Sequence, residues 1–387
     1  MAVSLFSSGL YAQEPVRLKE VKVSCGADLT GTYFHELSGR RIGVVANQSS
    51  RIGSVHLVDS LKGSGFDVIR VFAPEHGFRG NEEAGAVIQG GKDPQTGIEV
   101  VSLYGDRFKP SKENLADLDL VIFDLQDVGA RFYTYISTLH YVMEACAELG
   151  IPLLVLDRPN PNGFYVDGPV LEDKYRSFVG MHPVPVVHGM TIGEYAGMIN
   201  GEGWLSGGIR CSLKVVKCQG YDHQTEYVLP IRPSPNLPNQ NAVYLYPSLC
   251  FFEGTIVSVG RGTPWPFEVF GHPSFAMPFS FIPEPVVGAS LNPLHKGTVC
   301  KGVDLRGMGR PIQEAAPRIH LSWLIEAYQA SGSGEKFFNS FFDRLAGTSR
   351  VREMILKGME EDEIRESWRE EIEVFRKIRS RYLLYPE

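Results

Sequence analysis

The feature that most constrains the fold is an alternation of short apolar runs with amphipathic stretches between about residues 40 and 160. Residues 134–149 repeat apolar side chains at helical spacing and stop at Gly150. Apolar runs of strand length occur at residues 41–46, 67–72, 99–103, 118–123 and 152–156. Continuously apolar strands that alternate with helices are typical of a parallel sheet covered on both faces. We therefore predict an α/β fold whose first domain is built on a Rossmann-like parallel sheet.

The pattern changes beyond about residue 175, where short strands separated by proline-rich loops replace the regular alternation. This mixture predicts a smaller α+β C-terminal domain. Its expected elements are strands at 213–216 and 255–259 and helices at 320–330, 334–345 and 363–381. We place a leader at residues 1–25, the Rossmann-like domain at 26–170 and the C-terminal domain at 171–387.

The first thirteen residues are small and apolar and precede a polar run that begins with Glu14. They resemble the apolar core and cleavage end of an export signal that lacks its basic region. We expect the protein to be exported to the periplasm. The alternative is the frayed N-terminus of a cytoplasmic enzyme.

Charge and motif content exclude several functional classes. The chain has 38 Lys and Arg against 45 Asp and Glu, a net charge of −7, which disfavours nonspecific binding to nucleic acid. It has no run of 18 apolar residues, so we expect no membrane span. The first strand is followed by Asn47-Gln48-Ser49-Ser50 instead of a glycine-rich phosphate loop, so NAD, FAD and ATP are not expected.

The six cysteines are scattered and form no CxxC pair, so we predict neither a metal site nor a bound cofactor. Cys211 and Cys218 could form a disulfide if the protein is exported, but the sequence does not decide this. The sequence also gives no indication of the oligomeric state.

Polar segments follow the strands of the predicted sheet, and the carboxyl ends of parallel strands share one rim where ligands bind. Glu75 is our leading acid/base candidate at this rim, because Phe72 and Phe78 would shield its carboxyl from water as a general acid requires. Glu75 could instead cap a turn or pair with Arg79. The neighbouring His76 could orient Glu75, bind substrate, or make a structural hydrogen bond.

The segment after the fourth strand holds further candidates. Asp127 is a second catalytic candidate, although before Gly129 it could simply close a turn. Arg131, Tyr133 and Tyr135 together suit a sugar ring that carries an anionic substituent. The two tyrosines could equally be core residues at the start of a helix.

Polar residues near other strand ends are candidate substrate ligands. Asn47 follows the first strand, and Arg158 and Asn160 lie in a proline-stiffened loop after the fifth. Arg158 could instead pair internally with Asp157. His188 lies in a short Val-His-Gly segment that could reach the same rim.

Two stiff polar loops in the second domain add candidates. Asn236 lies in Ser-Pro-Asn-Leu-Pro-Asn, and Arg261 begins a loop that continues to Trp265 and Glu268. Ring stacking by Trp265 and a carboxylate from Glu268 would suit a carbohydrate. A tryptophan flanked by prolines is also often a packing residue.

These motifs together resemble one bacterial family, the exo-β-N-acetylmuramidases. The resemblance covers nearly the whole chain after residue 40. The motifs that carry it are Ala73-Pro74-Glu75-His76-Gly77, Asp124-x-Gln126-Asp127-Val128-Gly129-x-Arg131-Phe132-Tyr133-Thr134-Tyr135, Asp157-Arg158-Pro159-Asn160-Pro161, His188-Gly189-Met190-Thr191, Ser234-Pro235-Asn236 and Gly260-Arg261-Gly262-Thr263.

The resemblance implies two domains with a cleft at their interface and release of N-acetylmuramic acid (MurNAc) from the non-reducing end of peptidoglycan fragments. It also implies that Glu75 is the catalytic acid/base. Val259 departs from the family pattern, because relatives often have a glutamate there, so the role of that carboxylate is in doubt. The alternative functions are a non-catalytic muropeptide-binding protein and, less favoured without a phosphate loop, a nucleotide-dependent sugar enzyme.

The chemistry of a glycosidase fits these residues. Glycoside hydrolysis usually needs two carboxyl groups, but the 2-acetamido oxygen of the substrate can replace the nucleophile. Asp127 would then polarise the acetamido group or act as a base. The lactyl carboxylate of MurNAc would explain an arginine in the cleft, whether Arg131, Arg158 or Arg261.

Overall fold

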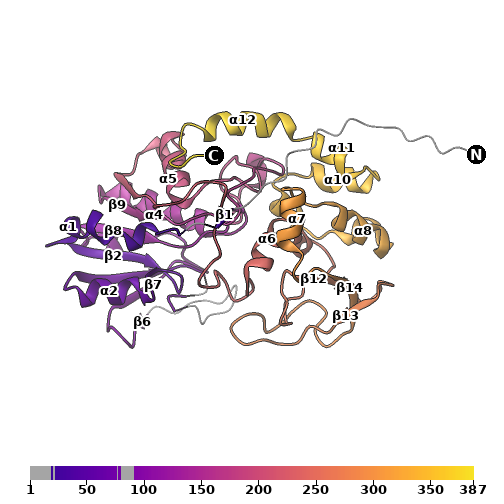
Figure 1. Ribbon diagram of the computed structural model, residues 1–387, viewed down its shortest axis with the longest axis horizontal. Helices are drawn as coiled ribbons and strands as arrows, with labels where there is room; N and C mark the ends of the chain where they lie inside the picture. The colour runs from indigo at the N-terminus through magenta and orange to yellow at the C-terminus, as the bar shows by residue number, and fades with distance from the viewer. Residues whose placement is uncertain (1–18, 21, 76, 80–90) are drawn as a thin grey trace, which may run out of the picture.

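The computed structural model describes residues 19–20, 22–75, 77–79 and 91–387 (Figure 1). The proposed export segment at residues 1–13 and the candidate His76 lie outside these described residues.

A seven-stranded sheet forms the first part of the molecule and confirms the predicted α/β class (Figure 1). Neighbouring strands run parallel except at one edge, where β6 is antiparallel to β7. All five strands expected from the alternation are present. In sheet order the strands are β10 (Leu213–Val216), β9 (Leu153–Leu156), β8 (Leu120–Asp124), β2 (Arg41–Ala46), β5 (Asp67–Ala73), β7 (Glu99–Ser102) and β6 (Gly91–Lys92).

Helices cover both faces of this sheet because successive strand residues point to opposite sides. Val45 packs in the core cluster that holds α4 (Tyr135–Leu149) and α5 (Ile192–Gly201). Val44 packs in a second cluster with α2 (Leu57–Gly63) and α1 (Phe34–Leu37). The short helix α3 (Lys112–Leu115) precedes β8. As expected, α4 stops at Gly150, whose φ of 68° is the left-handed conformation that favours glycine.

The strand β10 differs from the sequence-based expectation. It was assigned to the second domain, but Leu213 pairs with Leu153 and β10 extends the sheet beside β9. The sheet therefore continues beyond residue 170, where the domain boundary was expected. An isolated four-residue apolar run carries no sign of the sheet it joins, so local pattern could not assign it.

The position of β10 also bears on Cys211 and Cys218, which flank it. A four-residue strand spans roughly 13 Å, whereas a disulfide needs Cα atoms roughly 4–7 Å apart. Both cysteines are buried free thiols. The structure therefore does not contain the bridge considered from the sequence.

The C-terminal part combines a small antiparallel sheet with helices, as predicted (Figure 1). Residues 255–259, expected as a strand, form only isolated bridges such as Ser258 with Gly271. The expected helix at 334–345 is broken into a 3-10 turn and a short helix. The strands are β12 (Val269–His272), β14 (Cys300–Asp304) and β13 (Phe279–Phe281), and the helices are α6 (Gln240–Leu249), α7 (Gly309–Ala315), α8 (Ser322–Ser331), α9 (Phe342–Ala346), α10 (Arg350–Leu356) and α11 (Glu361–Glu366).

Two short strand pairs complete the secondary structure. β1 (Lys19–Glu20) runs parallel to β11 (Thr225–Glu226), and β3 (Arg51–Ile52) pairs with β4 (Val55–His56). Within the described ranges no helix is long and apolar enough to cross a membrane.

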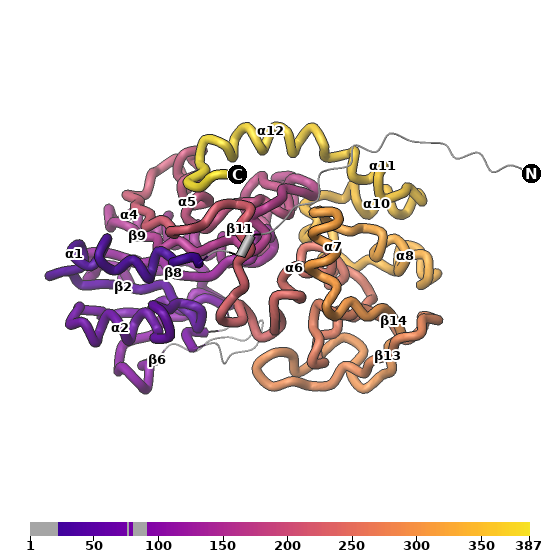
Figure 2. The backbone as a smooth tube through the Cα atoms, in the orientation of Figure 1, coloured from indigo at the N-terminus to yellow at the C-terminus, as the bar shows by residue number. Residues whose placement is uncertain are grey.

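The last helix, α12 (Arg369–Arg379), leads the chain back over the sheet domain (Figures 1 and 2). The Arg379 guanidinium donates to the Gly189 carbonyl at 2.6 Å. The Tyr385 hydroxyl donates to Asp157 Oδ2 at 2.6 Å, and the Leu384 amide to Glu194 Oε1 at 2.8 Å. The C-terminal residues therefore bind the two parts of the molecule together.

Candidate functional site

A cavity of about 200 Å³, here called the Glu75 pocket, lies between the carboxyl edge of the sheet and the C-terminal part. The sheet side supplies Glu75 after β5 and the segment that leads into α4. The opposite side supplies residues around α6 and the loop after Gly260. Its lining residues are Glu75, Tyr104, Phe132, Tyr133, Thr134, Tyr135, Phe178, Val179, Ser234, Asn236, Leu237, Tyr246, Cys250, Glu253, Arg261, Phe267, Phe341 and Leu345.

Glu75 is held in this pocket by the hydroxyl group of Thr134. Thr134 occupies the N-cap position of α4, and its hydroxyl donates to Glu75 Oε2 at 3.1 Å. Tyr104 lines the same pocket, and burial followed by the Glu75 charge raises the pKa of its phenol. The alternative pairing with Arg79 is wrong, because Arg79 binds Asp59 and Asp93. Glu75 is therefore presented to the cavity.

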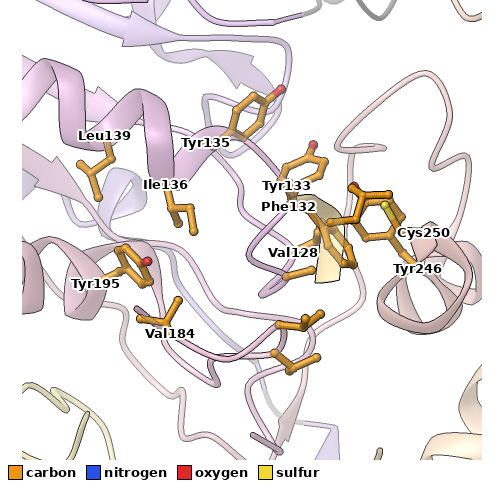
Figure 3. Packing of buried hydrophobic residues seen from close by; sticks show 14 of the residues in the cluster. Val128, Phe132, Tyr133, Tyr135, Ile136, Leu139, Val184, Tyr195, Tyr246 and Cys250 are labelled. Atoms are coloured by element: carbon orange, nitrogen blue, oxygen red, sulfur yellow. The ribbon is translucent and has the colours of Figure 1, made fainter. Parts of the chain in front are cut away.

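Aromatic side chains line the same pocket as Glu75 and form an aromatic wall. Figure 3 shows three of them, Tyr133, Tyr135 and Tyr246. Tyr133 and Tyr135 pack edge to face with ring centroids 4.8 Å apart, and Tyr246 lies across from Tyr133 at 6.0 Å. Both candidate tyrosines therefore line the pocket while also belonging to the core. The expected shielding by Phe72 and Phe78 is wrong, because these two rings pack in the core clusters away from the pocket lining.

Asn47 contacts Tyr135 of this aromatic wall from outside the pocket lining. Its Nδ2 donates to the Tyr135 hydroxyl at 2.7 Å, and its Oδ1 accepts from the Ser49 amide and hydroxyl. Asn47 is fully buried and fixes Tyr135 without lining the pocket itself.

Asn236 reaches the pocket from the proline-stiffened loop. Its Nδ2 donates to the Ala289 carbonyl at 3.0 Å. Its Oδ1 is buried and has no partner among the described residues. This side chain is therefore fixed at one end and can accept a hydrogen bond at the other.

Arg261 and Glu253 form an ion pair in the pocket wall. The Arg261 Nε donates to Glu253 Oε1, and the guanidinium lies 5.1 Å from the centre of the Phe267 ring. Burial alone would lower the pKa of Arg261, but the Glu253 carboxylate outweighs burial and raises it. The Cys250 thiol donates to Glu253 Oε2 at 3.7 Å. The pocket thus holds a fixed cation beside a carboxylate that is already paired.

Arg131 does not face the pocket, contrary to the sequence-based expectation. It is fully buried and donates to four backbone carbonyls, those of Pro169, Val184, Leu345 and Ala346, at 2.7–2.9 Å. Burial lowers its pKa to about 9. Arg131 joins the sheet domain to the C-terminal part and does not line the Glu75 pocket.

The Arg158 side chain also binds other protein groups and does not line the pocket. Its NH2 donates to Asp124 Oδ2 at 2.9 Å in a buried ion pair, rather than pairing with Asp157. A further bond reaches the Arg51 carbonyl at 3.0 Å. Asn160 is equally occupied, because its Nδ2 donates to the Met190 carbonyl and its Oδ1 accepts from the Asn162 amide.

Asp127 and His188 form a buried pair outside the pocket lining. Asp127 Oδ2 accepts from the Gly129 amide at 2.7 Å, which is the turn-closing role left open by the sequence. His188 Nε2 lies 3.8 Å from Asp127 Oδ2. Burial raises the pKa of Asp127 to about 7 and lowers the pKa of His188 to about 3.

Glu268 has a structural role as well. Its two carboxylate oxygens accept from Asn239 Nδ2 at 2.9 Å and Asn241 Nδ2 at 2.7 Å, which fixes the start of α6. Among the described residues no group of three or more His, Cys, Asp or Glu is arranged to hold a metal ion.

A larger hollow of about 580 Å³ lies beside α11 and α12. Its charged side chains pair with one another: Arg365 binds Asp167 at 2.8 Å, and Arg369 binds Glu366 at 2.8 Å. These pairs stabilise the surface, so the smaller Glu75 pocket is the better candidate for chemistry.

Comparison with known proteins identifies the family. A family model described as exo-beta-N-acetylmuramidase NamZ, N-terminal, matches residues 42–241, and the corresponding C-terminal model matches residues 244–385. This chain belongs to the NamZ family. The N-terminal model includes β10, in agreement with the sheet.

Relatives support this assignment over nearly the whole chain. The chain is 38% identical to the peptidoglycan beta-N-acetylmuramidase NamZ of Bacillus subtilis (strain 168), over 95% of this chain and 92% of that protein. Two crystal structures of DUF1343 family proteins from Bacteroides fragilis NCTC 9343 have the same fold. One is 45% identical with a TM-score of 0.88, the other 28% identical with a TM-score of 0.78, and each covers 95% of this chain and 100% of its own.

Several pocket residues of this NamZ family member escaped sequence analysis. Tyr104, Tyr246 and Glu253 belong to segments without a recognisable motif, and they approach Glu75 or Arg261 only through the tertiary fold. Glu253 lies eight residues before Arg261, a spacing that suggests no pairing by itself. Thr134 was part of the family motif but was not singled out.

Proposed function

We propose that this protein is an exo-acting β-N-acetylmuramidase that releases MurNAc from the non-reducing end of peptidoglycan fragments, with Glu75 as the general acid/base. Membership of the NamZ family supports the glycosidase activity. The single observation that supports the role of Glu75 is its position in the wall of an aromatic-lined cavity, where the Thr134 hydroxyl donates to its carboxyl.

In the first step, Glu75 donates a proton to the glycosidic oxygen as the bond to the anomeric carbon breaks. Positive charge then develops on the sugar ring. The Glu75 carboxylate left behind removes a proton from the water that completes hydrolysis, which returns the enzyme to its starting state. Thr134 holds the same carboxyl in place for both steps.

We assign the nucleophile of the first step to the 2-acetamido oxygen of MurNAc itself, an accepted variation of glycoside hydrolysis. Its bond to the anomeric carbon forms as the glycosidic bond breaks, and the water activated by Glu75 then attacks that carbon and breaks this bond again, which restores the acetamido group. Two other carboxylates, those of Glu253 and Asp127, are not available as the nucleophile. Glu253 is paired with Arg261, and Asp127 is buried outside the pocket lining. This differs from the role in polarising the acetamido group that the sequence suggested for Asp127.

We propose that Arg261 binds the lactyl carboxylate that distinguishes MurNAc from N-acetylglucosamine (GlcNAc). Of the three arginines expected in the cleft, it is the one that lines the pocket. Its Nε binds Glu253, which orients the guanidinium. A guanidinium held in this way suits two parallel hydrogen bonds to a carboxylate.

The test is the kinetics of Glu75→Gln on a nitrophenyl β-MurNAc substrate and on the disaccharide MurNAc–GlcNAc. General acid–base catalysis contributes roughly 10²- to 10⁴-fold, so kcat should fall by at least about 100-fold. The exposed Glu373→Gln on α12 is the matched control and should retain wild-type turnover. Unchanged turnover by Glu75→Gln on both substrates would overturn the assignment. Binding of the disaccharide by the wild type without sugar release would favour a non-catalytic binding protein instead.

A further inference from the structure

Another hollow, here called the Trp265 groove, lies in the C-terminal part between residues 262–265 and 280–286 and has a volume of about 660 Å³. Most of its lining residues are apolar. Ile282 is 45% exposed and Val286 is 38% exposed, although both are large aliphatic residues. The mechanism proposed above makes no use of this groove.

Trp265 is held firmly in the wall of the groove. The Arg306 guanidinium lies 4.3 Å from the centre of the indole ring. Asp304 in turn fixes Arg306. The Arg306 Nε donates to Asp304 Oδ1 at 2.9 Å, and the Arg306 NH2 group donates to Asp304 Oδ2 at 2.6 Å. An indole ring held by Arg306 and packed against the Val269, Phe281 and Cys300 cluster is a rigid surface that loses little conformational freedom when a ligand binds to it.

The groove and the Glu75 pocket are linked at two places by neighbouring parts of the chain. Arg261 lines the pocket, and the next residue, Gly262, lines the groove. On the other side, Val286 lines the groove and begins a tight turn that pairs it with Ser290. The Ala289 carbonyl in that turn accepts from Asn236, which lines the pocket.

We propose that the Trp265 groove binds the glycan chain of peptidoglycan on the reducing-end side of the bond that is cleaved. The inference rests on the proposed function, because an exo-acting enzyme encloses the terminal sugar and the rest of the chain must leave past the pocket rim. The apolar face of a pyranose ring stacks on Trp265. Thr263, Ser280 and Glu284 at the groove supply polar groups for its hydroxyl and acetamido substituents.

The test compares substrates of different length. For each variant, kcat/KM is measured on the tetrasaccharide MurNAc–GlcNAc–MurNAc–GlcNAc and on nitrophenyl β-MurNAc, which cannot reach the groove. Ile282→Asp and Trp265→Ala should lower the ratio of the two values about threefold to tenfold, mainly through KM for the tetrasaccharide. Val374→Asp on α12, where Val374 is 58% exposed, is the control and should leave the ratio unchanged.

Ile282→Asp changes an exposed side chain, so it tests the groove even if Trp265→Ala fails to fold. An unchanged ratio in a folded Ile282→Asp variant overturns the groove proposal and leaves the proposed function intact. A change of molecular mass in this variant on size-exclusion chromatography, with an unchanged ratio, identifies the groove as a contact between copies of the chain and also overturns the groove proposal.

If the wild type cleaves neither substrate, the proposed function fails. The groove proposal is then tested by calorimetric titration, which measures the affinity of each protein for the tetrasaccharide. Equal affinities of the wild type and Ile282→Asp would overturn the groove proposal.

Discussion

At the scale of single residues, the Glu75 pocket is built from side chains that hold one another in place. Thr134 shows this most simply, because it could cap α4 but donates to Glu75 Oε2 instead. Arg261 is similarly fixed by Glu253. The chemistry therefore depends on partners that do not themselves touch the reacting bond.

The first prediction concerns Thr134→Val, which removes the hydroxyl while keeping the shape of the side chain. A hydrogen bond to a charged group contributes about 1.5–3 kcal/mol, so kcat should fall about tenfold or more while KM changes little. Thr134→Ser, which keeps the hydroxyl, should recover most of the activity. Steady-state kinetics on nitrophenyl β-MurNAc checks this, and equal losses in both variants would contradict it.

The second prediction concerns Arg261→Gln and sugar discrimination. Free MurNAc should inhibit the wild type more strongly than free GlcNAc, because only MurNAc carries the lactyl carboxylate. In Arg261→Gln the two inhibition constants should approach each other, with a loss of roughly 10-fold to 100-fold for MurNAc. The exposed Arg369→Gln is the control. A preference for MurNAc that survives in Arg261→Gln would argue against this role.

The third prediction uses the buried Asp127, whose pKa is raised by burial to about 7. Its folded form holds a proton between about pH 4 and 7 that the unfolded chain releases, so this group makes the free energy of unfolding fall as pH rises through that window. His188 acts in the opposite sense below about pH 6.5, because burial lowers its pKa. The difference between Asp127→Asn and wild type isolates the Asp127 contribution.

Asp127→Asn should therefore gain stability relative to wild type on going from pH 5 to pH 8. We expect the difference in Tm, variant minus wild type, to be at least roughly 3 °C more positive at pH 8. Thermal unfolding followed by circular dichroism at both pH values measures it. A difference that is the same at pH 5 and pH 8 would show that Asp127 has no raised pKa.

At the scale of elements, the carboxyl ends of β5 and β8 carry the part of the site that the sequence could predict. Glu75 follows β5, and Tyr133 and Tyr135 precede or begin α4, so topology alone brings them to one rim. The same segment contains Arg131, which points into the protein instead. Periodicity identifies the element but not the direction of each side chain in an irregular loop.

The fourth prediction belongs to this scale, because Arg131 joins elements of both parts of the molecule. Arg131→Met fills similar space but leaves buried carbonyls of Pro169, Val184, Leu345 and Ala346 without their donor. Each such group costs about 1–3 kcal/mol, so the free energy of unfolding should fall by at least about 3 kcal/mol. Urea denaturation measures this loss. An unchanged denaturation midpoint with a raised KM would instead support a role in substrate binding.

At the scale of the whole molecule, one continuous core joins the sheet domain to the C-terminal part. Phe132 and Tyr133 from the sheet side pack near Tyr246 and Cys250 (Figure 3), and α12 returns over the sheet domain (Figures 1 and 2). The Glu75 pocket lies within this junction. Its position therefore depends on the packing of both parts.

The packing of the C-terminal part against the sheet domain also explains what the sequence could not predict. The α/β class followed from apolar periodicity, and Glu75 followed from strand ends and the family resemblance. By contrast, Glu253 and Tyr246 reach the pocket only because the C-terminal part packs against the sheet. Arg158 and Asn160 carry polar groups typical of ligand contacts, yet the fold uses them internally. Burial of a polar side chain is decided by long-range packing, which local sequence does not encode.

The most direct test of the account follows the products of MurNAc–GlcNAc–MurNAc–GlcNAc by mass spectrometry at early times. The wild type should release free MurNAc and a matching trisaccharide before any disaccharide appears, and Glu75→Gln should release at least about 100-fold less. Early disaccharide products from the wild type, or equal MurNAc release by Glu75→Gln, would contradict an exo-acting enzyme that depends on the Glu75 carboxyl.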